Sequence, residues 1–292
     1  AVSIANLKAA AKFSKKEIYE YIKSEDKPLC LPYPLMNIIN GGAHANNSLE
    51  IQEFMIRPDG AKNFKECMQM SFLVIQNLKK YLESKKISTS VGDEGGFAPS
   101  LRSDEEAIEI IINSISSSGL KPGKDVSICL DVAANELKVP KNVQYFLDLL
   151  QKYPIKSIED PFSEDDWDNW KNLTQKTKAQ IVGDDLFVTN KKRLEKGIKE
   201  KSANTILIKP NQIGTVSETL ETIKLAKDNN FKTIISHRSG DSEDTFIADL
   251  AVATNSSQIK TGSLARSERV AKYNRLLRIE ERLGNQSKMA KI

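Results

Sequence analysis

The chain has 292 residues, of which 39% are hydrophobic and 28% charged, a composition typical of a soluble globular protein. Its 43 Lys and Arg residues are interspersed with 39 Asp and Glu residues and leave a net charge of only +4, which argues against nucleic acid or a membrane surface as a partner. The cysteines Cys30, Cys67 and Cys129 form no CxxC motif, and the sequence shows no secretory signal or membrane span, so we expect a reducing, cytoplasmic location.

The first part of the chain predicts a helix, a connector and two strands. Residues 1–23 have the pattern of an amphipathic helix. The Pro-bearing connector SEDKPLCLPYP then marks a domain boundary near residue 30, which divides the chain into a short segment, 1–29, and a main domain, 30–292. Strand-like runs at 35–40 and 49–58 follow. The loop GGAHANNS between them is too short for a parallel crossover, so we expect an antiparallel pair.

Two helices and then a regular alternation of strands and helices follow this pair. The helices are expected at 63–84 and 103–118, on either side of the loop STSVGDEGGFAPS. Six further strands are expected near 126–131, 155–159, 180–184, 205–209, 233–237 and 257–260, with amphipathic helices between them. This α/β order, ββαα(βα)6, favours a closed TIM-type barrel in which the carboxyl ends of the parallel strands share one mouth.

Three of these strands end on acids, namely Asp131, Glu159 and Asp184. Adjacent carboxylates repel one another unless a cation lies between them, and hard oxygen ligands favour magnesium or manganese over zinc. The alternative is a structural carboxylate cluster without a metal. Asp160 and Asp185 adjoin two of these acids, and we expect their side chains to point the other way and to act as supporting or capping groups.

Two other strands end on lysines at the same mouth. A lysine beside a metal and a second lysine has its charged form disfavoured, so Lys209 is a candidate base. Lys260 is better suited to binding an anionic substrate. The alternative for each lysine is a salt bridge to a nearby carboxylate.

Loop residues complete the predicted site. His237, Arg238 and Ser239, in SHRSG, suit a phosphate group, since a guanidinium can bind it with two hydrogen bonds. Glu94 lies between glycines in VGDEGGFAP, which let the backbone approach a ligand closely. Glu53, with Gln52 beside it, lies in the second strand, so Glu53 and Glu94 are candidate acids for a leaving group.

Together, these segments resemble the enolase family over about residues 1–283. The matching segments, in order, are NIINGGAHANN with IQEF, SVGDEGGFAP, LDVAANE, SIEDPFSEDDW, VGDDLFVTN, ILIKPNQIGT, SHRSGDSEDTFIADLAV and IKTGSLARSERVAKYNRLLRIEE. The resemblance implies an enolase-type TIM barrel. It also implies a hydro-lyase that dehydrates 2-phosphoglycerate to phosphoenolpyruvate with magnesium. A Lys or His base working with magnesium is general in this superfamily.

The resemblance assigns a role to each matched position. Asp131, Glu159 and Asp184 would bind the first of two magnesium ions. The catalytic residues would be Lys209 as the base at carbon 2, Glu94 and Glu53 as the acid for the hydroxyl at carbon 3, and His237. The substrate-binding residues would be His44, Gln52, Arg238, Ser239 and Lys260, of which Arg238 and Ser239 would bind the phosphate and the second metal.

Two departures from the family qualify this resemblance. Family members carry a smaller α+β domain before the barrel, and residues 1–29 match only its last helix and linker. A lid serine from that domain helps to hold the second magnesium, so we expect an incomplete second site and weak turnover. The ending LGNQSKMAKI also lacks the family's aromatic-containing tail. We expect a homodimer for the complete protein. The alternatives are another acid-metabolising member of the superfamily and a non-catalytic binding or structural module.

Overall fold

A computed structural model describes residues 1–23 and 28–292 and contains a closed barrel of eight strands. The strands follow one another around the barrel in chain order: β2 (Tyr33–Asn40), β3 (Glu53–Arg57), β4 (Ser127–Asp131), β5 (Ile155–Glu159), β6 (Gln180–Gly183), β7 (Thr205–Ile208), β8 (Lys232–Ser236) and β9 (Gln258–Lys260). The predicted barrel and its strand order are therefore confirmed.

One strand runs against the other seven. β3 pairs antiparallel with both β2 and β4, while the remaining pairs, including β9 with β2, are parallel. The expected antiparallel first pair is thus confirmed. The expected strand at 49–58 was too long, because β3 begins only at Glu53. Since β3 is reversed, its first residue lies at the mouth where the parallel strands end, and Glu53 pairs with Asp131 in the register.

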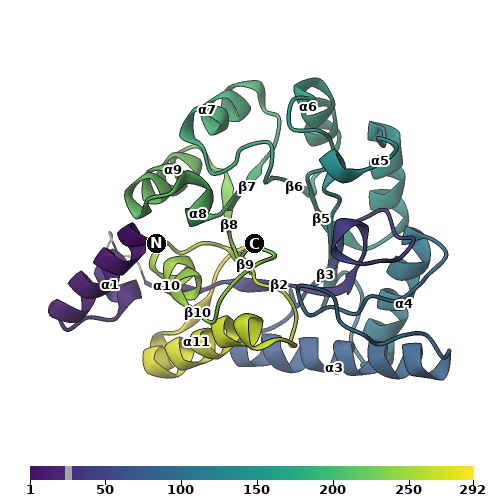
Figure 1. The fold of residues 1–292 in the computed structure, drawn as a ribbon, viewed down its shortest axis with the longest axis horizontal. Coiled ribbons are helices and arrows are strands. Elements are labelled where there is room, and N and C mark those ends of the chain that lie inside the picture. Colours follow the sequence, from purple (N-terminus) through teal and green to yellow (C-terminus); the bar gives the residue numbers. More distant parts are fainter. Residues whose placement is uncertain (24–27) are drawn as a thin grey trace.

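Helices surround the barrel (Figure 1). They are α3 (Phe64–Ser84), α4 (Asp104–Ser117), α5 (Val143–Lys152), α6 (Trp167–Lys176), α7 (Lys191–Glu200), α8 (Pro210–Ile213), α9 (Val216–Asp228), α10 (Phe246–Ala253) and α11 (Ser267–Leu283). Helices α3 to α7 and α9 begin after a polar side chain that accepts a backbone N–H of the first turn, from Asn63, Ser103, Asn142, Asp166, Asn190 and Thr215. In α5, Val143, Phe146 and Leu149 lie on the buried face, as the helical repeat requires.

The strands are buried on both faces. A large apolar layer separates them from the helices, and a smaller cluster fills the barrel interior with Leu35, Met55, Cys129, Val182, Leu207 and Ile234. Side chains two residues apart on a strand share a face. The residue two positions from each interior residue therefore also faces the barrel axis. This explains why polar residues at the ends of buried apolar strands meet at the mouth.

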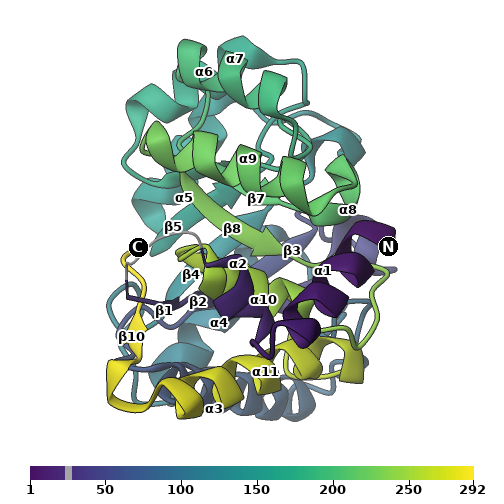
Figure 2. The same ribbon diagram turned by 90° about the vertical axis from the view of Figure 1, so that its left-hand side faces the viewer.

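Two short helices precede the barrel. α1 (Val2–Phe13) contacts α9, and α2 (Ile18–Ile22) packs against α10 (Figure 2). The strands β1 (Cys30–Leu31) and β10 (Lys288–Met289) form a separate parallel pair. The predicted connector begins in residues 24–27, which lie outside the described residues, and the boundary near residue 30 stays a prediction. Within 1–23 and 28–292, no helix combines the length and apolar character needed to span a membrane.

The remaining short elements are three turns of 3₁₀ helix. They are η1 (Gly42–His44), η2 (Ala134–Glu136) and η3 (Gly284–Gln286). η1 carries His44 in the loop between β2 and β3, and η2 follows β4 immediately after the mouth residue Asp131. Both therefore lie in loops at the mouth of the barrel.

Candidate active site

The mouth residues of the barrel are placed by the two-residue repeat of the strands. Cys129, Val182 and Leu207 belong to the interior cluster. The residues two positions further along, Asp131, Asp184 and Lys209, therefore face the same axis. The reversed strand β3 obeys the same rule in the other direction, since interior Met55 lies two residues after Glu53.

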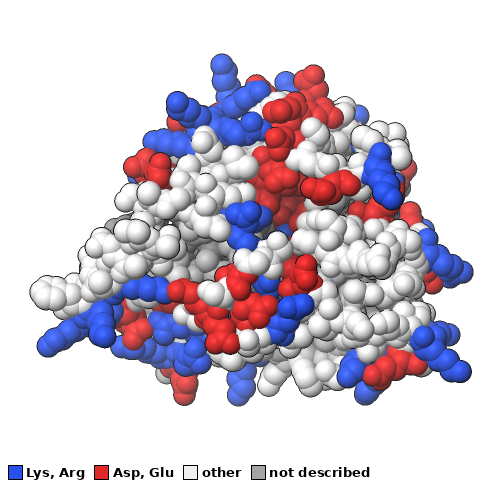
Figure 3. Space-filling model, in the orientation of Figure 1, with Lys and Arg blue, Asp and Glu red and all other residues white. Residues whose placement is uncertain are grey.

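A cavity of about 170 Å³ lies at this mouth. Of the twelve residues predicted for the site, eleven line it: His44, Gln52, Glu53, Glu94, Asp131, Asp184, Lys209, His237, Arg238, Ser239 and Lys260. The twelfth, Glu159, is buried beside the cavity and reaches it through Lys260. On this face of the molecule, acidic side chains gather around a central hollow (Figure 3).

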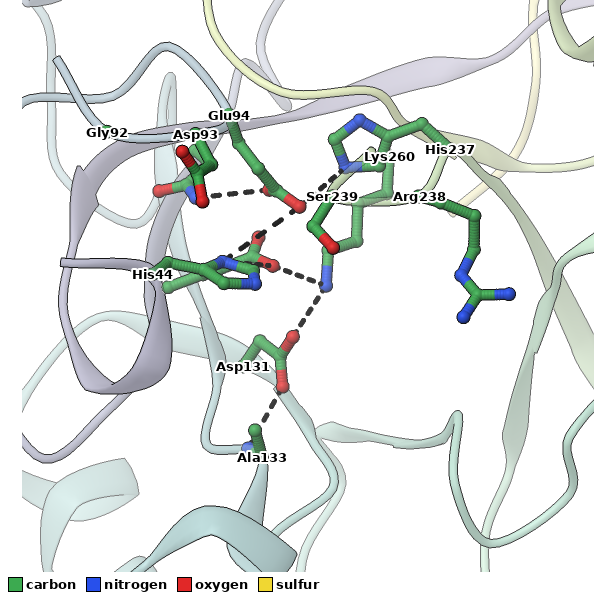
Figure 4. Close-up of polar contacts among 12 residues, drawn as sticks. His44, Gly92, Asp93, Glu94, Asp131, Ala133, His237, Arg238, Ser239 and Lys260 are labelled. Atoms are coloured by element: carbon green, nitrogen blue, oxygen red, sulfur yellow. Dashed lines mark hydrogen bonds and ion pairs between the residues drawn. The ribbon is translucent and has the colours of Figure 1, made fainter. Parts of the chain in front are cut away.

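Lys260 lies at the centre of three carboxylates. Its Nζ contacts Asp131 (Figure 4) at 2.7 Å from Oδ2. It also lies 2.9 Å from Glu159 Oε1 and 3.2 Å from Glu53 Oε1. Burial would lower the pKa of Lys260, but the surrounding carboxylates outweigh burial and raise it well above its ordinary value. This lysine therefore stays protonated, in the salt-bridged form that the sequence left open as an alternative.

Lys209 also contacts a carboxylate, that of Asp184. Burial and Lys260 would lower the pKa of Lys209, but Asp184 raises it, and the net shift is upward. The salt bridge that the sequence left open as an alternative is therefore present for Lys209. The depressed pKa was expected for a lysine beside a bound metal, and it stays a prediction.

Asp160 and Asp185 do not point away from the mouth, and that expectation is wrong. Both line the cavity, and ligand oxygens of Asp160, Asp184 and Asp185 lie within 4.8 Å of one another. Asp160 has a left-handed backbone, with φ of 42°, which breaks the two-residue repeat at the strand end. Its carboxylate accepts the backbone N–H groups of Asp184 and Asp185, each at 2.9 Å, and so fixes the start of that loop.

Glu94 is buried in the loop between α3 and α4. One of its carboxylate oxygens accepts a hydrogen bond from Asn37 Nδ2 at 3.2 Å, and the other lies 3.2 Å from His237 Nε2. Its backbone carbonyl accepts the N–H of Ser263 at 2.9 Å. Burial would raise the pKa of Glu94, but His237, Lys260 and His44 together hold it well below its ordinary value.

Glu53 lies in the same buried group but has the opposite shift. Burial, Glu94 and the other nearby acids raise its pKa well above the ordinary value, although Lys260 opposes them. His44 Nδ1 lies 3.8 Å from Glu53 and 4.0 Å from Glu94. The surroundings therefore disfavour the charged form of Glu53 and favour the charged form of Glu94.

The loop after β8 supplies the cationic side of the cavity. His237 is buried, and burial lowers its pKa despite the opposing effect of Glu94. The Arg238 side chain extends away from the Glu94–His237 pair (Figure 4), and its Nη1 donates to Asn211 Oδ1 at 3.3 Å. Arg238 and Ser239 are exposed, so their polar groups remain accessible to an anion.

Comparison with known proteins agrees with this geometry. Residues 28–150 and 137–292 match the family model described as "Enolase, C-terminal TIM barrel domain". The curated enolase of Pelagibacter ubique (strain HTCC1062) is 60% identical over 309 aligned residues, which cover 100% of this chain and 73% of the relative. The chain belongs to the enolase family. Enolases depend on magnesium, so the mouth of the barrel should offer side chains that can bind this ion.

The enolase mouth has the chemistry that a magnesium ion requires. Its candidate ligands, Asp131, Glu159 and Asp184, are buried carboxylates on consecutive strands, and magnesium prefers oxygen ligands. Glu53 Oε2 in the same group has no hydrogen-bond partner among the described residues. The lysines now placed between these acids show that the cluster attracts positive charge. The ligand assignment itself stays a prediction.

Two residues of the enolase mouth were missed from sequence. Asn37 and Arg269 contact Glu94 and His237, respectively. Both lie inside segments that carry the resemblance, but neither stands at a strand end or in a Gly-rich loop. Arg269 could have been found from the sequence, because the apolar pattern of its helix marks position 269 as buried although the residue is charged. Its relative exposure is indeed only 1%.

Proposed function

We propose that the chain catalyses the magnesium-dependent dehydration of 2-phosphoglycerate to phosphoenolpyruvate in glycolysis, and the reverse reaction in gluconeogenesis. The observation that carries this proposal is the 60% identity to a curated enolase across the whole chain. The convergence of predicted acids, lysines and phosphate-binding groups on one cavity supports it.

Lys209 acts as the base that removes the proton from carbon 2. It lies at the carboxyl end of β7 and faces the cavity. The ion pair with Asp184 stabilises the protonated form of Lys209. Lys209 therefore becomes a base only when another cation balances the charge of Asp184. Asp131, Glu159 and Asp184 would hold magnesium. A bound divalent ion supplies stabilisation of the negative charge that accumulates on the substrate carboxylate.

Glu53 and Glu94 together release the hydroxyl at carbon 3. Their pKa values are shifted in opposite directions, and in this proposal Glu53 carries the proton while Glu94 is charged. That proton passes to the departing hydroxyl, which leaves as water while the double bond forms between carbons 2 and 3. His44 and His237 flank the pair and keep it oriented.

Different groups bind the two anionic ends of the substrate. Arg238 and Ser239 offer guanidinium and hydroxyl groups to the phosphate, since both are exposed at the cavity. Lys260 neutralises the substrate carboxylate, and Gln52 lines the same wall. Electrostatic attraction of this kind is stronger in a buried site than in water.

We infer the location and the assembly from the family resemblance and the cysteines. Cys30, Cys67 and Cys129 are free thiols in the structure, which supports a reducing, cytoplasmic location. A homodimer is the assembly that the family resemblance implies. Light scattering of the purified chain tests the dimer directly.

The decisive experiment follows carbon 2 and the product separately. The chain, alone and extended by the smaller domain that the resemblance places before the barrel, is given 2-phosphoglycerate and magnesium. Deuterium exchange at carbon 2 and formation of the enol phosphate are both measured. Turnover by either form, lost in Lys209→Ala and retained in Lys232→Ala at the exposed start of β8, supports the proposal. A binding module would show neither exchange nor product.

A further inference from the structure

Arg269 is a buried cation that contacts both loops of the acid group. It lies in the first turn of α11 with a relative exposure of 1%. Its Nη1 lies 2.5 Å from His237 Nδ1 and donates to the carbonyl of Arg238 at 2.7 Å. Its Nη2 donates to the carbonyls of Ser239 at 2.6 Å and Asp93 at 3.3 Å. One guanidinium therefore ties the loop that carries Glu94 to the loop that carries His237.

The contact with His237 determines where the imidazole proton lies. A guanidinium has five N–H donors and no acceptor. Nδ1 of His237 must therefore accept the hydrogen bond from Arg269, which leaves the proton of the neutral ring on Nε2. Nε2 lies 3.2 Å from Glu94 Oε1, but the angle of this contact is too poor for a hydrogen bond, and Nε2 has no hydrogen-bond partner among the described residues.

The surroundings leave Arg269 little freedom to move. Gly262 packs against its side chain, and a Cβ atom at that glycine would lie 2.8 Å from Arg269 Cδ. A lysine at position 269 would have a single ammonium where the guanidinium reaches an imidazole and three carbonyls. The planar, forked shape of arginine therefore suits this position.

We propose that Arg269 is a positioning residue that holds His237 in the Nε2–H tautomer, so that the imidazole proton lies on the ring nitrogen beside Glu94. The consequence for turnover rests on the proposed function: without this contact, Glu94 no longer faces an N–H group of His237, and the proton needed at carbon 3 is delivered less efficiently. The base Lys209 has no contact with Arg269 among the described residues, so exchange at carbon 2 is affected less.

Nitrogen NMR of the histidine rings tests the tautomer without any substrate. The chain has only two histidines, His44 and His237, so ¹⁵N-histidine labelling gives two ring systems, which His44→Gln assigns. Above the ordinary pKa of imidazole, we expect His237 to carry its proton on Nε2 by at least about tenfold over Nδ1. A proton on Nδ1 in the unaltered chain overturns the proposal, so the test does not depend on any variant folding.

Variants then separate the contact with the histidine from the clamping of the loops. Arg269→Met should lose most of the tautomer preference, whereas Arg266→Met should keep it. Arg266 is the matched control because its Nε donates to the carbonyl of Gly92, in the Glu94 loop, at 2.9 Å without touching His237. An unchanged tautomer in folded Arg269→Met contradicts the proposal.

Kinetics provide the second measurement. In Arg269→Met we expect loss of the carbon 3 hydroxyl to slow at least about tenfold more than carbon 2 exchange, while Arg266→Met shows no such split. Equal slowing of both steps in Arg269→Met would make it a structural residue and overturn the proposal. If the chain proves inactive on 2-phosphoglycerate, the proposed function fails, but the NMR result still decides the tautomer.

Discussion

Lys260 Nζ lies 2.7 Å from Asp131 Oδ2, and this buried contact joins β9 to β4 across the mouth of the barrel. The same ammonium is within 3.2 Å of Glu159 and Glu53, so one cation balances three carboxylates. Charges removed from water are stable only when each has a partner. Lys260 therefore affects both the stability of the mouth and the ability of its carboxylates to bind a divalent ion.

Replacing that lysine should destabilise the chain most when no divalent ion is present. Lys260→Met leaves three buried carboxylates without their shared cation, and we expect a loss of about 3–5 kcal/mol in the free energy of unfolding. Urea denaturation with and without magnesium measures it. Lys156→Met, at an exposed position on β5, is the control and should change stability little. Similar losses of unfolding free energy in both variants would show that Lys260 stabilises the chain no more than an exposed lysine does.

The two halves of the proposed reaction should fail separately. Lys209→Ala should abolish carbon 2 exchange, because it removes the base. Glu94→Gln should slow hydroxyl loss by about 10²–10⁴-fold with a smaller effect on exchange, because it removes the acid partner and leaves the base in place. Exchange is followed in deuterated water and product by its absorbance. Retained exchange in folded Lys209→Ala would assign the base elsewhere.

The barrel and most of its mouth could be predicted from the sequence because strands impose a simple repeat. An apolar run that ends on Asp131 or Lys209 fixes both the strand and the side on which its last polar group lies. The reversed direction of β3 was also accessible, from the short loop before it. The exact start of β3 was not, because residues 49–52 continue the apolar pattern without joining the strand.

Pairing within the mouth could not be predicted from the sequence. The preference of Lys209 for Asp184 depends on which side chains converge, and it raises the pKa of this lysine. Asp160 faces the cavity only because its backbone is left-handed, a local conformation that an Asp-Pro pair does not specify. Arg269 was missed because its burial shows only in the helical spacing to Tyr273 and Leu276, and an arginine is seldom expected on a buried face.

Magnesium should stabilise the chain through Asp184. Binding at the folded mouth shifts the unfolding equilibrium by mass action, so the melting temperature should rise with magnesium concentration. Asp184→Asn should lose most of this rise, while Asp148→Asn, at an exposed position on α5, should keep it. Calorimetry with magnesium and then with excess chelator measures the shift. The same shift in both variants would remove Asp184 from the ligand set.

Gly95 should tolerate no side chain, because both its backbone and its surroundings exclude one. Its φ is +83°, and a Cβ atom would lie 2.5 Å from the carbonyl oxygen of Ala265. Gly95→Ala should cost about 1–3 kcal/mol from backbone strain, with a further cost from the clash, and should displace Glu94. Gly119→Ala is the matched control, since Gly119 has φ of +76° and open space around it. Equal losses in stability would show that the clash contributes nothing.

The acid sensitivity of the chain should depend in part on Glu17. Its carboxylate accepts a hydrogen bond from Arg275 at 2.6 Å and also contacts Arg282, so it joins α2 to α11. The Arg275 hydrogen bond, helped by both positive charges and opposed by burial, lowers the pKa of Glu17 below its ordinary value of 4.5.

The sign of the pH effect follows from that lowered pKa. The stabilisation from Glu17 is complete above the ordinary value and is lost as the pH falls through the folded-state pKa. Glu17→Gln keeps the size and polarity of the side chain but removes its charge. It should therefore cost about 1 kcal/mol or less near neutral pH, and its difference from the unaltered chain should shrink in acid. Urea unfolding from neutral to acid pH measures this difference in the free energy of unfolding, with Glu281→Gln at an exposed position as the control. A difference between Glu17→Gln and the unaltered chain that stays constant down to acid pH would show that the ion pairs of Glu17 contribute nothing.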